Sequence, residues 1–196
     1  MQSLETRQLL VDTTRITLRR INHQEFEQLC QDNPDLRLEL TATGELVTMT
    51  PAGYESSNQN FKLAARVFIW NESTQLGEGF DSSGGFTLPS GAVRSPDVTW
   101  IENSKLVSIS SDVAFPKVVP DFVIELRSKS DSLTTLKEKM LEYRTNGVRL
   151  GWLINPQQKQ VEIYRLEQEV EVLESPTTLS GEDVLPGFVL DLSTIW

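Results

Sequence analysis

The spacing of hydrophobic positions along the chain predicts three helices. The first covers 22–31 with Asn22 as its N-cap, the second covers 54–71, and the third begins after Asp131-Ser132 and runs to about 146. The apolar residues that set this spacing are Phe26 and Leu29 in the first helix, Phe61, Ala64, Ala65, Phe68 and Ile69 in the second, and Leu133, Leu136, Met140 and Tyr143 in the third.

Alternation with a period of two predicts strands between and after these helices. The first two form a hairpin with Gly44 in its turn, and the fourth, which is more apolar, is expected to be buried. The chain of 196 residues shows no internal repeat and fits one α/β domain spanning 1–196. The expected strands are 36–40, 45–49, 95–101, 121–127, 150–154, 160–164 and 170–173.

The amino-acid composition excludes several kinds of metal site and a disulfide, but it says less about the fold. The chain is 38% hydrophobic and 23% charged, which is enough apolar material for a folded core. A single cysteine, Cys30, excludes an intramolecular disulfide and a cysteine-rich zinc cluster, and a single histidine, His23, excludes a multi-histidine metal site. Any metal would therefore be held largely by oxygen. No stretch approaches the ~20 apolar residues of a membrane span, so we expect a soluble, cytoplasmic protein without a membrane partner.

The net charge argues against general binding to nucleic acid. Eighteen basic and 28 acidic residues give −10, and an acidic surface repels a phosphate backbone. The acidic excess is concentrated after Pro156, whereas 121–155 is about neutral. A local basic site remains compatible with this distribution.

Two carboxylates stand out among the predicted strands. Glu125 lies in the middle of an apolar strand, where a carboxylate costs several kcal/mol unless a cation or donors compensate for it. A salt bridge to Arg127 would explain Glu125 without any function, and Asp97, after Pro96, would serve equally as an ordinary turn residue.

Together with a following helix that carries Lys137 and Lys139, the two carboxylates form the set that hydrolysis of phosphodiesters needs. Carboxylate oxygens hold Mg²⁺, the cation neutralises phosphate charge and lowers the pKa of a bound water, and a lysine steadies developing charge. This spacing alone is weak evidence.

Six segments of the chain carry a resemblance to a known family: 44–51, 53–55, 95–98, 119–133, 137–148 and 150–154. In these segments the chain resembles the Uma family, bacterial proteins classed as restriction endonucleases and formerly catalogued as a domain of unknown function, within the PD-(D/E)xK nuclease superfamily. The resemblance extends from about Phe26 to Tyr164. It implies a restriction-endonuclease-like fold, a central mixed β-sheet flanked by helices, and a DNA endonuclease that uses Mg²⁺ or Mn²⁺.

By this resemblance, Asp97 and Glu125 correspond to the two metal-binding carboxylates. The chain departs from the superfamily pattern two residues after Glu125, where Arg127 replaces a lysine; its guanidinium stays protonated and cannot act as a base. The family resembles branches in which the lysine has moved to the following helix, which favours Lys139 over Lys137. Helical geometry does not distinguish the two lysines, because they lie at similar angles on either side of the apolar face.

Two further acidic residues are candidates. Glu55, near the start of the long helix, is similar to the acidic residue that some superfamily members carry there, and we expect it in the metal site; stabilisation of the helix dipole is its structural alternative. Glu39, from the hairpin, is a weaker candidate.

Two other classes of function compete with a nuclease. A nuclease fold without catalysis would be a module that binds nucleic acid or protein, as Arg127 and the acidic charge suggest. A homodimeric scaffold is the third hypothesis, because exposed edges of C-terminal strands often pair, and we expect a homodimer.

Overall fold

The structure is a computed structural model that describes residues 20–110 and 112–196. Its helices are α1 (His23–Asp32), α2 (Tyr54–Thr74), α3 (Asn103–Leu106) and α4 (Leu133–Thr145). Its strands are β1 (Arg37–Leu40), β2 (Leu46–Met49), β3 (Gly77–Asp81), β4 (Phe86–Thr87), β5 (Val93–Arg94), β6 (Val98–Glu102), β7 (Phe122–Leu126), β8 (Leu150–Asn155), β9 (Gln160–Arg165), β10 (Glu171–Glu174), β11 (Thr178–Ser180) and β12 (Val189–Asp191).

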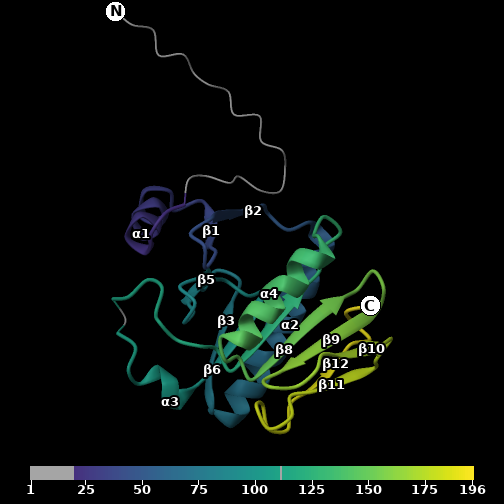
Figure 1. The fold of residues 1–196 in the computed structure, drawn as a ribbon. Coiled ribbons are helices and arrows are strands. Elements are labelled where there is room, and N and C mark those ends of the chain that lie inside the picture. Colours follow the sequence, from purple (N-terminus) through teal and green to yellow (C-terminus); the bar gives the residue numbers. More distant parts are fainter. Residues whose placement is uncertain (1–19, 111) are drawn as a thin grey trace, which may run out of the picture.

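A mixed six-stranded sheet forms the centre of the molecule. Its strand order is β10-β9-β8-β7-β6-β3, in which β7 and β8 are parallel and every other neighbouring pair is antiparallel. Helix α4 connects the two parallel strands, as a parallel pair requires a crossover. In Figure 1 α4 lies in front of the sheet and α2 behind it. The predicted mixed α/β fold is confirmed.

Alternation along the central strands separates two cores. On one face of β7, Ile124 packs in a cluster with Leu63 and Val67 of α2; on the other, Val123 packs with Met140 and Tyr143 of α4. The strand is buried on both faces, which explains its near-continuous apolar sequence. Glu125 points to the α4 side.

A smaller sheet lies beside the central one. Its order is β2-β1-β5-β4, and α1 packs on it through the fully buried Phe26. A third sheet pairs β11 with β12 near the C-terminal end, and its Leu179 and Leu190 join the core on the α2 side. The small sheet matters for the site because β1 carries Glu39.

The predicted helices are confirmed, with one correction. Asn22 caps α1 as expected, and α2 runs three residues further than predicted, to Thr74. However, α2 buries Leu63, Val67 and Trp70, whereas Phe61 and Phe68, which set the predicted face, are 73% and 59% exposed. Apolar residues occur around most of α2, so their spacing alone does not identify the face that meets the sheet.

The strands were predicted less completely. The strand predicted at 95–101 corresponds to β6, which begins three residues later and ends at Glu102. The strands β3, β4, β5, β11 and β12 were not predicted. These are short strands, most of them without a clear alternating pattern. No helix within the described residues has both the length and the hydrophobicity to cross a bilayer.

We predict that Gly77→Ala destabilises the protein strongly. A Cβ at Gly77 would lie 2.2 Å from the carbonyl oxygen of Ile101 and 2.6 Å from the Trp100 ring, so β3 must move away from β6. We expect the free energy of unfolding to fall by about 3 kcal/mol in urea titrations, at the upper end of overpacking effects. The matched control is Gly79→Ala on the same strand, where the nearest atoms lie at 3.9 Å. Equal effects at the two positions would contradict the prediction.

Candidate functional site

Three carboxylates from the two larger sheets converge beneath α4. Glu39 comes from β1 of the small sheet, Glu125 from β7, and Asp97 from the residue immediately before β6. Glu39 and Glu125 are 2% and 4% exposed. Pairing of Val98 with Ile124 brings Asp97 beside Glu125 on the face that α4 covers.

Lys139 of α4 connects the two sheets at this point. Its Nζ lies 2.9 Å from Glu39 Oε1 and 2.8 Å from Glu125 Oε1. The side chain is 12% exposed, so its charge is matched by the two carboxylates more than by water.

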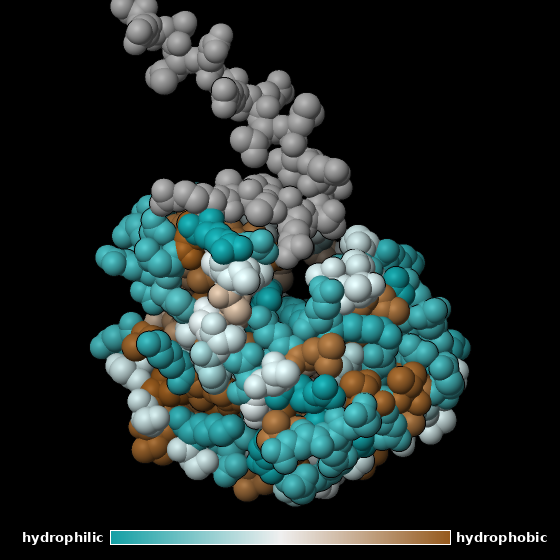
Figure 2. Space-filling view, in the orientation of Figure 1, coloured by the Kyte–Doolittle hydropathy of each residue, from teal (hydrophilic) through white to brown (hydrophobic). Residues whose placement is uncertain are grey.

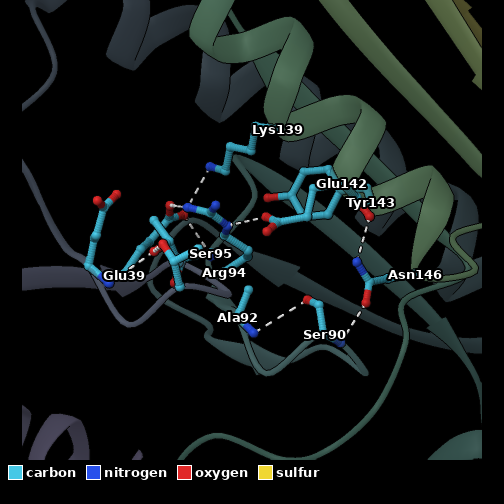
Figure 3. A network of polar contacts seen from close by, with 12 residues as sticks. Glu39, Ser90, Ala92, Arg94, Ser95, Lys139, Glu142, Tyr143 and Asn146 are labelled. Atoms are coloured by element: carbon cyan, nitrogen blue, oxygen red, sulfur yellow. Dashed lines mark hydrogen bonds and ion pairs between the residues drawn. The ribbon is translucent and has the colours of Figure 1, made fainter. Parts of the chain in front are cut away.

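Arg94 of β5 links the small sheet to α4, and Figure 3 shows it below that helix. Its guanidinium donates to Glu39 Oε2 at 3.0 Å and to Glu142 Oε2 of α4. The backbone N–H of Ser95 donates to Glu39 Oε1 at 2.9 Å. Both oxygens of Glu39 are therefore held.

Glu125 and Asp97 are each held through one oxygen. Tyr143 donates its hydroxyl proton to Glu125 Oε1 at 2.8 Å, the same oxygen that Lys139 approaches. The backbone N–H of Leu126 donates to Asp97 Oδ2 at 2.8 Å. This arrangement orients both carboxylates while their second oxygens take no part in these bonds.

Burial and neighbouring charges shift the pKa values of the cluster in different directions. Burial raises the pKa of Glu125 to about 7, with further contributions from Asp97 and Glu39, against the opposing effect of Lys139. Burial also raises the pKa of Asp97. Burial acts on Glu39 in the same sense, but Lys139 and Arg94 outweigh it, so the pKa of Glu39 is lowered.

The cluster carries more negative than positive charge. Among the described residues, the cations that act on the four carboxylates of Glu39, Asp97, Glu125 and Glu142 are Lys139 and Arg94. Hard cations such as Mg²⁺ take carboxylate oxygens as ligands and complete their coordination with water and phosphate. Within residues 20–110 and 112–196, no group of three or more Asp, Glu, His or Cys is already arranged around one point. The donor chemistry fits a cation held by two carboxylates, with solvent and substrate supplying the remaining ligands.

The structure brings together Asp97, Glu125 and Lys139, and it adds Glu39 to them. The other two basic candidates lie elsewhere. Lys137 pairs with Glu162 of β9 at 2.7 Å. Arg127 donates to the Asn155 side chain at 3.4 Å and to the Asp131 carbonyl.

Glu55 lies outside the cluster in this structure. It is exposed near the start of α2 and pairs with Lys129 of the β7–α4 loop at 2.7 Å. Its role in a metal site stays a prediction.

Sequence reasoning missed Arg94 and Glu142 and assigned Tyr143 only to the core. Tyr143 does pack in the core, and its hydroxyl reaches Glu125 from there. The hydroxyl group of Tyr143 could have identified it from the sequence, because a buried tyrosine hydroxyl usually forms a hydrogen bond. Arg94 depends on a pairing of β1 with β5 across more than 50 residues, which periodicity does not reveal.

Comparisons with known proteins identify a family and similar solved structures. The model of the Uma2 family, described as "Putative restriction endonuclease", matches residues 23–193. The crystal structure of "a putative nuclease belonging to DUF820" from Anabaena variabilis ATCC 29413 is similar with a TM-score of 0.75 and 21% identity, over 88% of this chain and 95% of that chain. No curated protein matches.

We predict that Lys139→Met destabilises the protein by about 3 kcal/mol, because it leaves Glu39 and Glu125 buried with less compensating charge. The control is Lys129→Met, which removes an exposed pair and should cost less than about 1 kcal/mol. Urea titrations at neutral pH measure both. A loss in Lys139→Met no larger than in the control would contradict the charge balance described above.

We also predict a pH dependence of stability in the metal-free protein. The pKa of Glu125 is raised to about 7 in the fold from an ordinary value of 4.5, so the folded state keeps a proton that the unfolded state releases. The contribution of Glu125 to the free energy of unfolding should therefore fall as pH rises from about 4.5 to about 7. Urea titrations across this range should show the fall in wild type and a flatter profile in Glu125→Gln. Parallel profiles would contradict the shift.

Proposed function

The chain belongs to the Uma2 family, as its sequence resemblance indicated, and from this membership we propose that it is a metal-dependent endonuclease that hydrolyses phosphodiester bonds in DNA. The observation that carries the proposal is the buried cluster in which Asp97, Glu125 and Lys139 meet. A carboxylate pair with a lysine at its edge is costly to bury, and strongly perturbed carboxylates of this kind concentrate at functional sites.

We assign Asp97 and Glu125 as the residues that hold Mg²⁺ or Mn²⁺. Hydrogen bonds to Asp97 Oδ2 and Glu125 Oε1 orient the two carboxylates and leave the other oxygen of each to face a cation. Such a cation, when bound, supplies a Lewis acid that neutralises phosphate charge and lowers the pKa of a bound water.

Lys139 acts in this proposal as a fixed positive charge. Burial would favour the neutral amine, but Glu125 and Glu39 outweigh it and raise the pKa of Lys139 well above its ordinary value. A lysine held in this state donates hydrogen bonds and does not accept a proton. Its role is to orient water or to stabilise charge that develops on the phosphate.

Glu39 and Tyr143 are positioning residues in the proposed mechanism. Glu39 holds Lys139 from the small sheet and Tyr143 holds Glu125 Oε1 from α4. Because both contacts lie within the buried cluster, they restrict the rotamers of the residues that would meet the substrate.

A non-catalytic module is the second candidate. The observation that favours it is that Lys139 already pairs with both Glu125 and Glu39, so these side chains form a connected network without a metal ion. Such a module would bind DNA or protein through the same face and leave phosphodiester bonds intact. We favour the nuclease because the cluster carries more negative than positive charge, which a bound metal ion would offset. We propose that either form is a cytoplasmic homodimer.

We predict that the purified protein nicks supercoiled plasmid with Mg²⁺ or Mn²⁺, and that chelation by EDTA abolishes nicking. Asp97→Asn and Lys139→Met should each lower the rate by at least about 100-fold, since each removes a group that acts on the transition state. Gel assays of initial rates measure this.

The matched control is Lys137→Met on the same helix, which should retain cleavage within about ten-fold because its partner Glu162 lies two strands from Glu125. Equal nicking by wild type and Asp97→Asn would show a contaminating nuclease. Metal binding that is unchanged when Asp97 and Glu125 are both replaced by alanine would overturn the metal site, and DNA binding without cleavage would favour the module.

A further inference from the structure

One face of α2 presents two aromatic side chains to solvent, with two partly buried alanines between them. This face, which we call the α2 face, consists of Phe61, Ala64, Ala65 and Phe68. It borders a groove of about 790 Å³ whose other side includes Gly79 and Phe80 of β3. The opposite side of α2 packs on the sheet through Leu63, Val67 and Trp70, and Ala64 packs against the edge of this core. Phe61 and Phe68 are exposed outside it.

The exposed aromatic area is large for one helix. Phe61 is 73% exposed and Phe68 is 59% exposed. At roughly 200 Å² for a phenylalanine, the two rings leave roughly 260 Å² in water, which is about a third of the ~800 Å² that each partner buries in a standard interface. The neighbouring groove and β3 would supply area toward the remainder.

The order of residues on the α2 face is compatible with two-fold symmetry. Phe61 and Phe68 are seven residues apart, close to two helical turns, and Ala64 and Ala65 lie midway between them. If a second α2 crosses antiparallel with the axis at the two alanines, Phe61 of each copy meets Phe68 of the other. The small alanines permit close approach where the helices cross. This reciprocal contact is what an isologous interface requires.

Strand β3 offers the same symmetry beside the helix. It ends the six-stranded sheet, and its register pairs it only with β6 among the described strands. Gly79, at its centre, lies beneath α2, since a Cβ there would be 4.0 Å from Val67 Cγ1. An edge strand is a template for pairing with another strand, and antiparallel pairing of β3 with a second β3 has a two-fold axis at its centre.

The lack of charge on the α2 face favours a second copy of this chain over DNA or a basic protein as its partner. The four residues of the α2 face carry no charge, and Asp81 is the charged residue that lines the groove. Interface cores are depleted of charge and enriched in aromatics, whereas DNA and basic proteins are attracted by charge. A second copy brings the same uncharged helix face, whereas the exposed acidic residues of β3, Glu78 and Asp81, lie on the strand beside it.

We propose that the α2 face and the free edge of β3 form a two-fold interface between two copies of this chain. The pairing buries the phenylalanines of both copies and extends the two central sheets into one. It rests on packing alone and is independent of the proposed cleavage.

Sedimentation velocity on the full chain tests the proposal. Wild type should be dimeric at about 10 μM, and Phe61→Glu and Phe68→Glu should each raise the dissociation constant at least about 100-fold, because each buries a charge without a partner. Val107→Glu is the matched control, since Val107 is 88% exposed outside this surface. Circular dichroism establishes that each variant is folded.

A cross-linking experiment tests the position of the axis. In a Cys30→Ala background, Ala64→Cys or Ala65→Cys should give a disulfide-linked dimer under mild oxidation, because residues beside a two-fold axis lie near their own copies. Val107→Cys should not. Monomeric wild type at about 100 μM would overturn the proposal, and so would a dimer that resists both glutamate substitutions and forms no cross-link. Plasmid nicking plays no part in either result.

Discussion

The ion pairs of Lys139 with Glu39 and Glu125 are the contacts on which the architecture of the site depends. Three parts of the chain that are far apart in sequence must meet to form them: β1 in the small sheet, β7 in the central sheet and α4 above both. Ionised groups with so little exposure are costly to leave unpaired, so each part of this structure restricts the others. The small sheet is thereby connected to the central sheet through Lys139, and Arg94 adds an ion pair between the small sheet and α4.

This arrangement also explains why the cluster is unlike an ordinary structural salt bridge. A structural pair is most stable when charges balance, but here Asp97 and Glu125 lie together and burial raises the pKa of both carboxyls. Replacing such a cluster with apolar residues of similar volume is often neutral or stabilising in proteins. Its presence is therefore better explained by a function than by stability, which agrees with the family to which the chain belongs.

The sequence predicted features that depend on neighbouring residues better than features that depend on long-range packing. Asn22 and Ser132 cap their helices as predicted, because capping depends on residues within one turn. The exposed side of α2 was misjudged, since Phe61 and Phe68 have helical spacing and yet face solvent. Periodicity shows that a helix has an apolar side, but packing against the sheet decides which side is buried.

The choice between Lys137 and Lys139 shows the same limit inside the site. The two residues flank one apolar face at similar angles, and the chain alone gives no reason to separate them. In the fold, α4 lies across several strands, so Lys137 reaches Glu162 on β9 while Lys139 reaches Glu125 on β7. The distinction comes from the order β9-β8-β7 in the sheet, which is a long-range property. Two lysines on one helix thus find different carboxylates on different strands, and together they hold α4 in the position that places Tyr143 and Lys139 on the same oxygen of Glu125.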